Sequence, residues 1–198
     1  MTPEDVKNLT ETLKMLGELI ESKPNEWLPL YAALGGAIAG AIASFFPTFM
    51  LERYREKKYS RRILASLLSE ISALLEIVQH RGYHKSIKDK IEYLRTQPVG
   101  STCSFTVHVP EHYSRIYQEN CANIGAIDEF YSQKIVIFHQ LIDSIVQDVE
   151  PGGIISSGAK IGAFEEIDII FTRAIQIGNE LLQAHNHHIQ TDSAVPLR

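Results

Sequence analysis

The chain has 198 residues, enough for one domain of ordinary size with appendages, and 44% of them are hydrophobic, an ordinary share for a globular protein. Its formal net charge is −5 at pH 7. Residues 63–198 carry ten Lys or Arg against sixteen Asp or Glu, a net of −6, which argues against a surface for nucleic acid.

Residues 1–26 predict a short amphipathic helix. Thr2 is a good N-cap residue and Pro3 suits the first helical turn. Apolar residues then alternate at spacings of three and four: Val6, Leu9, Leu13, Leu16 and Ile20. Helices that lie on membranes carry Lys and Arg on their polar face, whereas this polar face is mainly acidic. Packing against a sister helix is therefore favoured, and a frayed solvent-exposed helix is the alternative.

Residues 27–51 predict a transmembrane helix. This stretch of 25 residues contains no Asp, Glu, Lys, Arg or His. A helix of that length reaches roughly 37 Å, more than the hydrocarbon core of about 30 Å. A buried core helix would usually be interrupted by a polar face within about 18 residues. A signal peptide would be shorter and would follow a basic start, so we expect the segment to stay in the mature protein.

Within this span, residues are segregated by size. Four small residues follow one side of the helix and define what we call the small-residue line: Ala32, Gly36, Gly40 and Ser44. The bulky ridge on the other side consists of Leu34, Ile38 and Ile42. Because water does not drive helices together in lipid, close backbone approach between small residues supplies the packing. The line predicts self-association, and a lone span merely rich in Gly and Ala is the alternative.

Residues 52–62, "ERYREKKYSRR", form a basic juxtamembrane stalk. Two acidic residues stand among six basic ones: Arg53, Arg55, Lys57, Lys58, Arg61 and Arg62. Residues 1–26 instead hold six acidic residues against three Lys. Because positive charge stays inside, the N-terminus is predicted outside the inner (plasma) membrane and the C-terminal part in the cytoplasm. The six cations are either a solvated orientation signal or, in addition, a site for anionic lipid headgroups.

Residues 63–188 predict a cytoplasmic helical bundle. No Gly or Pro interrupts the helix between the stalk and Gly82, and an apolar stripe runs along it: Leu64, Leu67, Ile71, Leu74 and Val78. Further helices are predicted over 84–97, 111–124, 129–149 and 158–186. A second apolar stripe comprises Phe164, Ile167, Phe171, Ala174, Gly178 and Leu181. "STCSFTVHV" (101–109) alternates like a strand, and 189–198 should be a flexible tail. The predicted fold is all-α with at most one short strand.

Residue chemistry points to neither an enzyme nor a cofactor. The chain has no P-loop, GxSxG, CxxC, HExxH or dinucleotide-binding motif. Cys103 and Cys121 are expected as free thiols in the core. Transition-metal sites are conceivable at His80 with His84, and at the cluster His185, His187 and His188. Gly82 weakens the first pair, and the second suits a helix C-terminus, so no metal site is predicted. Glu165, Glu166 and Asp168 are expected on a solvated face.

The segment "YQENCANIGAIDEFYSQKIVIFHQLI" (117–142) resembles small single-span bacterial membrane proteins, which share an Ile-Gly turn followed by a Lys-Ile-Val-x-Phe helix. This resemblance implies a helical domain and a membrane address, not a reaction. More loosely, the layout is similar to CRISPR-associated membrane accessory proteins, which join one span to a HEPN-like bundle and assemble into ring-shaped pores. HEPN nucleases carry an Arg and a His with four to six residues between them. Arg81 and His84 are separated by only two residues, so nuclease activity is not implied.

Three functions follow as hypotheses. The first is a single-pass, membrane-anchored scaffold or interaction protein that forms a homo-oligomer through its span. Its partners would be the lipid membrane, further copies of the chain and a cytoplasmic protein, and no nucleic acid is expected. The alternative is an oligomeric pore or membrane-perturbing effector, such as one acting in bacterial phage defence. An enzyme is the least favoured of the three.

Overall fold

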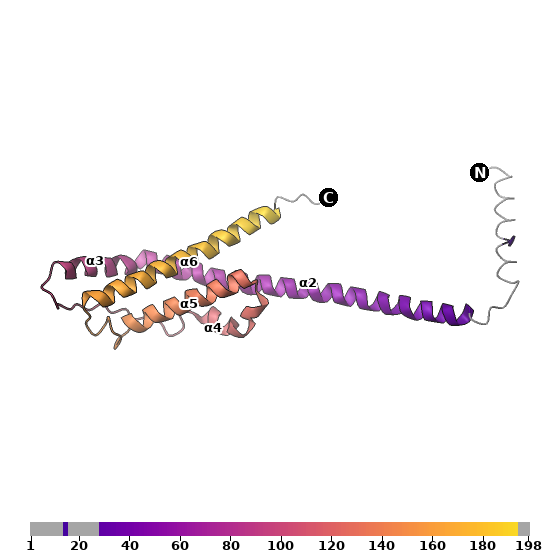
Figure 1. Ribbon diagram of the computed structural model, residues 1–198, viewed down its shortest axis with the longest axis horizontal. Helices are drawn as coiled ribbons and strands as arrows, with labels where there is room; N and C mark the ends of the chain where they lie inside the picture. The colour runs from indigo at the N-terminus through magenta and orange to yellow at the C-terminus, as the bar shows by residue number, and fades with distance from the viewer. Residues whose placement is uncertain (1–13, 16–27, 194–198) are drawn as a thin grey trace. The chain divides into compact units, whose positions relative to one another are not determined.

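The computed structural model describes residues 14–15 and 28–193, so the helix expected over 1–26 lies almost wholly outside the described residues. The chain divides into two compact units, Met1–Arg55 and Glu56–Arg198. Its described part is mostly helical and contains no named strand, which confirms the all-α class (Figure 1). The elements are α2 (Leu28–Arg81), α3 (Tyr83–Arg95), α4 (Arg115–Asn120), the 3-10 helix η1 (Cys121–Ala126), α5 (Glu129–Val149) and α6 (Ile161–Ser193).

Helix α2 is continuous over 54 residues and includes the predicted span, the basic stalk and the first helix of the bundle. Pro47 lies inside it without ending it. The helix ends at Gly82, whose φ of 64° is a left-handed conformation that glycine adopts readily. The N–H of Gly82 donates to the carbonyl of Gln79 (3.1 Å), and α3 begins at the next residue. The prediction that no break precedes Gly82 is confirmed.

The core of the second unit is built from the predicted apolar stripes. Helices α5 and α6 pack side by side, and α3 packs against α6 (Figure 1). On α2, Leu67 and Ile71 are fully buried, and the rest of that stripe is partly buried against the core. Every predicted member of the α6 stripe, from Phe164 to Leu181, is buried. Helix α5 adds Tyr131, Ile135, Phe138, Ile142, Ile145 and Val149.

Residues 101–109 are extended, as their alternation predicts, but do not form a strand. Cys103, Phe105 and Val107 pack toward the core, while the intervening residues are exposed. The N–H groups of Phe105 and Val107 donate to the carbonyls of Ile155 (3.2 Å) and Val149 (2.9 Å). Because the partner is the end of α5 and the turns after it, pairing gives only one isolated bridge, between Cys103 and Ala159.

Three helix boundaries test the predicted ranges. The range 129–149 matches α5, where the Asp128 side chain accepts a hydrogen bond from the N–H of Phe130. The range 111–124 is wrong as a single helix. Asn120 leaves helical geometry (φ −108°, ψ 0°), and its side chain donates to the carbonyl of Ile116, so α4 gives way to η1. Helix α6 continues to Ser193, five residues into the expected tail, and 194–198 lie outside the described residues.

Candidate functional site

The apolar part of α2 is exposed. It is the one helix in the described part of the chain that is long and apolar enough to cross a membrane, judged by length and composition. Its most apolar window has a mean hydropathy of 1.7, and none of that window is buried. Even large side chains such as Phe45 and Phe46 are 79% and 61% exposed. The segment is therefore not part of the core formed by the described residues.

The small-residue line lies on this exposed surface, because Ala32, Gly36, Gly40 and Ser44 are all exposed. A Cβ atom added at Gly36 or Gly40 would meet no neighbouring side chain within 4 Å. The hydroxyl of Ser44 donates to the carbonyl of Gly40 (2.9 Å), so its proton is used within the helix. The line is thus a shallow surface of low polarity, and its glycines are not needed for packing within the described chain.

The six predicted headgroup-binding residues are helical and exposed: Arg53, Arg55, Lys57, Lys58, Arg61 and Arg62. The guanidinium of Arg53 lies over the ring of Phe49, 4.7 Å from its centroid, which is a cation–π contact. An aromatic ring with a cation at the end of an apolar helix is typical of a membrane interface, where the stem stays apolar and the charge reaches water.

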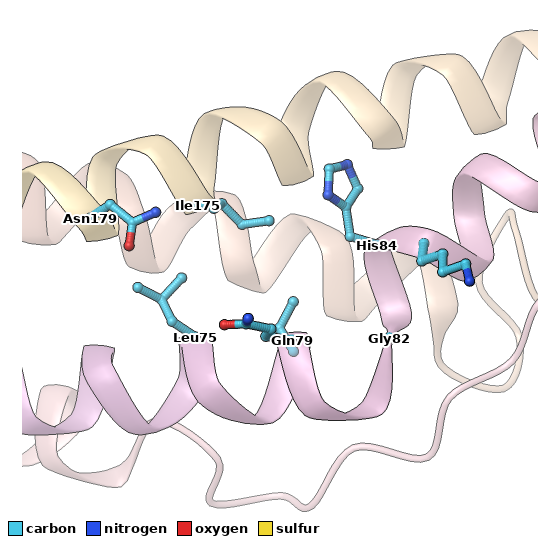
Figure 2. A pocket seen from close by; sticks show the side chains of 8 residues that line it. Leu75, Gln79, Gly82, His84, Ile175 and Asn179 are labelled. Atoms are coloured by element: carbon cyan, nitrogen blue, oxygen red, sulfur yellow. The ribbon is translucent and has the colours of Figure 1, made fainter.

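A pocket of about 260 Å³ lies where α2 ends and α3 begins, with α6 on the opposite side. Figure 2 shows Leu75 and Gln79 on α2, His84 just after Gly82, and Ile175 and Asn179 on α6. Val78 and Lys85 complete the lining. The walls combine aliphatic groups with two amides and an imidazole. This composition can hold a small polar molecule by hydrogen bonds.

His84 is oriented by groups on α6. Its Nε2 lies 2.7 Å from Oδ1 of Asp168, and its ring stacks on Phe171. The hydroxyl of Thr172 lies 3.4 Å from the same Nε2. A hydroxyl–imidazole–carboxylate relay needs the two ring nitrogens to face different partners, so this arrangement is not such a relay. It fixes the ring and connects α3 to α6.

The Arg81–His84 pair does not converge on one site. Gly82 places Arg81 at the end of α2 and His84 in α3. His84 lines the pocket of Figure 2, whereas Arg81 lines a different cavity of the same unit. His80 is likewise separated from His84 by the break at Gly82 and is exposed. The two residues singled out for the nuclease comparison therefore face separate spaces.

Two polar side chains are buried between α2, α4 and α5. The carboxylate of Glu70 (8% exposed) accepts hydrogen bonds from the N–H groups of Ile116 (2.7 Å) and Tyr117 (2.9 Å) at the start of α4. His139 is fully buried and stacks on the Tyr117 ring, with centroids 3.8 Å apart. Its Nε2 lies 3.8 Å from Oε2 of Glu70, beyond hydrogen-bond distance. Burial lowers the pKa of His139 from 6.5 to about 4.

Glu70 and His139 were not predicted as a pair from the sequence, although a signal existed. Glu70 lies one residue before buried Ile71, and His139 directly follows buried Phe138, so both border apolar stripes.

The expected solvated face on α6 also needs correction. Asp168 is half-buried against His84, and Glu165 pairs with Arg95 (2.9 Å), whereas Glu166 is exposed. Acidic residues beside an apolar stripe are well placed to link helices.

The cysteines and the terminal histidines complete the sequence-predicted residues. Cys103 is a free thiol partly buried against the core, as expected, but Cys121 is exposed in η1, so its predicted burial is wrong. His185, His187 and His188 all lie on α6. Within residues 14–15 and 28–193, no group of three or more His, Cys, Asp and Glu is placed to hold a metal ion.

Comparison with protein families, with characterised proteins and with solved structures gives no match to this chain.

Proposed function

We propose that this protein is a single-pass, membrane-anchored helical scaffold whose copies associate through the small-residue line. The observation that carries the proposal is the complete exposure of the apolar segment of α2. An uncharged helix of this length leaves a large apolar surface that a soluble monomer rarely presents to water. A bilayer accepts that surface, and a regular helix is the structure that satisfies its backbone polar groups there.

The orientation follows from charge. Residues 1–26 carry a net of −3, from six acidic residues and three Lys, and residues 52–62 carry a net of +4, from six basic residues and two acidic ones. The basic side stays inside, so the bundle is cytoplasmic and the N-terminus is extracytoplasmic, in the inner (plasma) membrane. The Arg53–Phe49 contact supports an interface near the end of the apolar segment.

Self-association is supported by the open space beside Gly36 and Gly40. Nothing within the described chain uses these glycines for packing, whereas small residues four apart allow two membrane helices to approach closely. The alternative of a water-filled oligomeric pore is less favoured. The hydroxyl proton of Ser44 already serves the carbonyl of Gly40, so the line offers little to solvate a lumen.

Leucine substitution of the small-residue line tests the proposal. Gly36→Leu with Gly40→Leu should abolish most energy transfer between copies tagged with donor and acceptor fluorophores in native membranes, because the added bulk separates the backbones. Insertion should be unaffected, because Leu is more hydrophobic than Gly. Leu34→Val on the opposite ridge should have little effect.

Gly35→Leu is the matched control, because it adds the same side chain in equally open space one residue off the line. Energy transfer should stay near the wild-type level in this variant. Equal losses from the double variant and from Gly35→Leu would mean that the association does not use the small-residue line. Unchanged transfer in the double variant would contradict association through this face. Leakage of dye from liposomes that hold the purified protein would instead favour the pore.

A further inference from the structure

A second cavity, of about 320 Å³, lies within the unit Glu56–Arg198 and has mainly apolar walls. One wall is the part of α2 from Leu74 to Arg81, and another is the part of α5 from Ile142 to Val149. The extended residues 105–110 form a third, and Tyr83, Tyr113 and Phe171 complete it. Twelve of the sixteen lining residues are aliphatic, Phe or Pro. Such walls suit a hydrocarbon ligand.

Among the few polar groups of the lining, Arg81 alone carries a permanent charge. These groups are Arg81, His108 and two tyrosines, and no Asp or Glu lines the cavity, although residues 63–198 hold six more acidic than basic residues. Arg81 and His108 are exposed, so they stand where the cavity opens to solvent. Tyr113 donates its hydroxyl proton to Asp143, and burial together with this hydrogen bond raises the pKa of Tyr113, so it stays neutral.

The cavity is elongated along the two helices. Leu74 to Arg81 is eight residues, about 10 Å of helix, and Ile142 to Val149 is the same length. The two helices run in the same direction here. Glu70 on α2 lies opposite His139 on α5, and on both helices the residues that line the cavity come after this point in the sequence. Arg81 is thus at one end of the cavity, and the other end holds Tyr113, whose hydroxyl proton is already donated to Asp143. The volume suits one hydrocarbon chain rather than the two chains of a phospholipid.

We propose that this cavity binds a free alkyl carboxylate of medium chain length, with its chain between α2 and α5 and its carboxylate at Arg81. Apolar walls provide the affinity by removing the chain from water. The guanidinium donates charge-assisted hydrogen bonds to the carboxylate, which no carboxylate of the lining opposes. If the chain is anchored as proposed above, such a ligand would reach the cavity by partitioning between membrane and cytoplasm.

Photolabelling of the full chain in detergent-free phosphatidylcholine nanodiscs tests this proposal. The probe is a decanoate analogue with a diazirine near its terminal methyl, and labelled residues are mapped by mass spectrometry. We expect labelling within 105–110 and 142–149 that excess decanoate suppresses and equimolar decyltrimethylammonium does not. Labelling confined to residues 31–51, or equal competition by the cationic amphiphile, would overturn the proposal.

Variants separate the cavity from general adsorption. Arg81→Gln should weaken labelling about tenfold, the effect of losing one charge-assisted hydrogen bond. Val146→Trp should fill the cavity and suppress labelling, and Ile77→Gln should do so at a lining position that is 50% exposed and tolerant of a polar residue. Ile169→Gln is the control, because Ile169 is 68% exposed and does not line the cavity.

The source of the ligand is tested in the same nanodiscs. A phosphatidylcholine with the diazirine on one acyl chain should leave 105–110 and 142–149 unlabelled. Labelling there as strong as with the decanoate analogue would mean that a bilayer lipid is the occupant and would overturn the proposal. Wild-type labelling in folded Ile77→Gln and Arg81→Gln variants would overturn it as well.

Discussion

The buried imidazole of His139 couples the stability of the bundle to pH. In the unfolded chain its pKa has the ordinary value of 6.5, whereas burial lowers the pKa to about 4 in the folded protein. Between these values the unfolded chain binds a proton that the folded chain does not. The free energy of unfolding therefore falls as the pH drops from 6.5 to 4, by about 3 kcal/mol for this group, and no further below 4.

Replacing His139 tests this dependence. In His139→Phe the aromatic ring that stacks on Tyr117 is kept and the titration is removed. Urea unfolding of the solubilised full chain at pH 7 and pH 4.5 should show a smaller loss of stability in the variant than in the wild type. His80→Gln, at an exposed position, should behave as the wild type. The same loss in all three proteins would contradict the assigned pKa.

Glu70 stabilises α4 through its two backbone hydrogen bonds. The N–H groups of Ile116 and Tyr117 lie in the first turn of α4, where no carbonyl of the helix can accept their hydrogen bonds. The buried carboxylate of Glu70 accepts both of these hydrogen bonds. Glu70→Gln removes the charge and places an NH₂ group against one of these donors. We expect a loss of about 2–3 kcal/mol in the free energy of unfolding. Glu76→Gln, at an exposed position of the same helix, should change it by less than about 0.5 kcal/mol, and equal effects would contradict this role.

At the scale of elements, the turn after α5 depends on Gly153. The N–H of Gly153 donates to the carbonyl of Glu150, and the following residues turn back so that Ile155 donates to the carbonyl of Asp148. A Cβ at Gly153 would lie 2.5 Å from the Asp148 carbonyl oxygen and would also overlap the Gln147 carbonyl oxygen. These are backbone atoms, so the clash cannot be relieved by moving a side chain. The same turns hold the extended residues 101–109.

We therefore expect Gly153→Ala to lower the free energy of unfolding by roughly 1–3 kcal/mol, the range for strained insertion of a methyl group. Gly162→Ala is the matched control. Its Cβ meets nothing within 4 Å, and alanine in a helix is preferred to glycine by up to about 1 kcal/mol, so stability should rise or stay constant. Thermal unfolding followed by circular dichroism measures both. A fall in stability for Gly162→Ala as large as for Gly153→Ala would be inconsistent with the backbone clash.

Sequence periodicity predicted the long helices, because the burial of a single apolar face dominates the packing of each. The stripe from Leu64 to Val78 and the stripe from Phe164 to Leu181 each have a single apolar face, and both pack as expected. The extended residues 101–109 show where periodicity stops being sufficient. Alternation fixed which side chains turn inward, but a ladder also needs a regular partner, and turns after α5 occupy that place. Pairing between distant segments leaves no local signal in the sequence.

For the same reason, some candidate sites were predicted from the sequence and others were not. The small-residue line and the basic residues 53–62 were found because their signal is composition along one helix. His84 with Asp168, and Glu70 with His139, join residues 84 and 69 positions apart, so spacing could not reveal them. The two cavities are formed by three or more elements each and were not predicted. Their existence depends on how side chains of different helices fit.

The described chain consists of two units with different surfaces. The first presents an apolar helix with no buried residue in its most apolar window, and the second has its own core of aliphatic and aromatic side chains. A membrane-anchored scaffold needs both a segment that lipid accepts and a domain that remains folded in water. In the proposed membrane-anchored arrangement, the charge difference between residues 1–26 and 52–62 predicts which end lies on which side.

Cysteine accessibility in intact cells tests whether the chain crosses the membrane and in which orientation. Cys103 and Cys121 are first replaced by Ser, and single cysteines are introduced as Ser22→Cys and Ser193→Cys. An impermeant maleimide should label Ser22→Cys in intact cells and should label Ser193→Cys only after the membrane is opened. Labelling of Ser193→Cys alone in intact cells would reverse the orientation, and protection of both or recovery in the soluble fraction would contradict a membrane span.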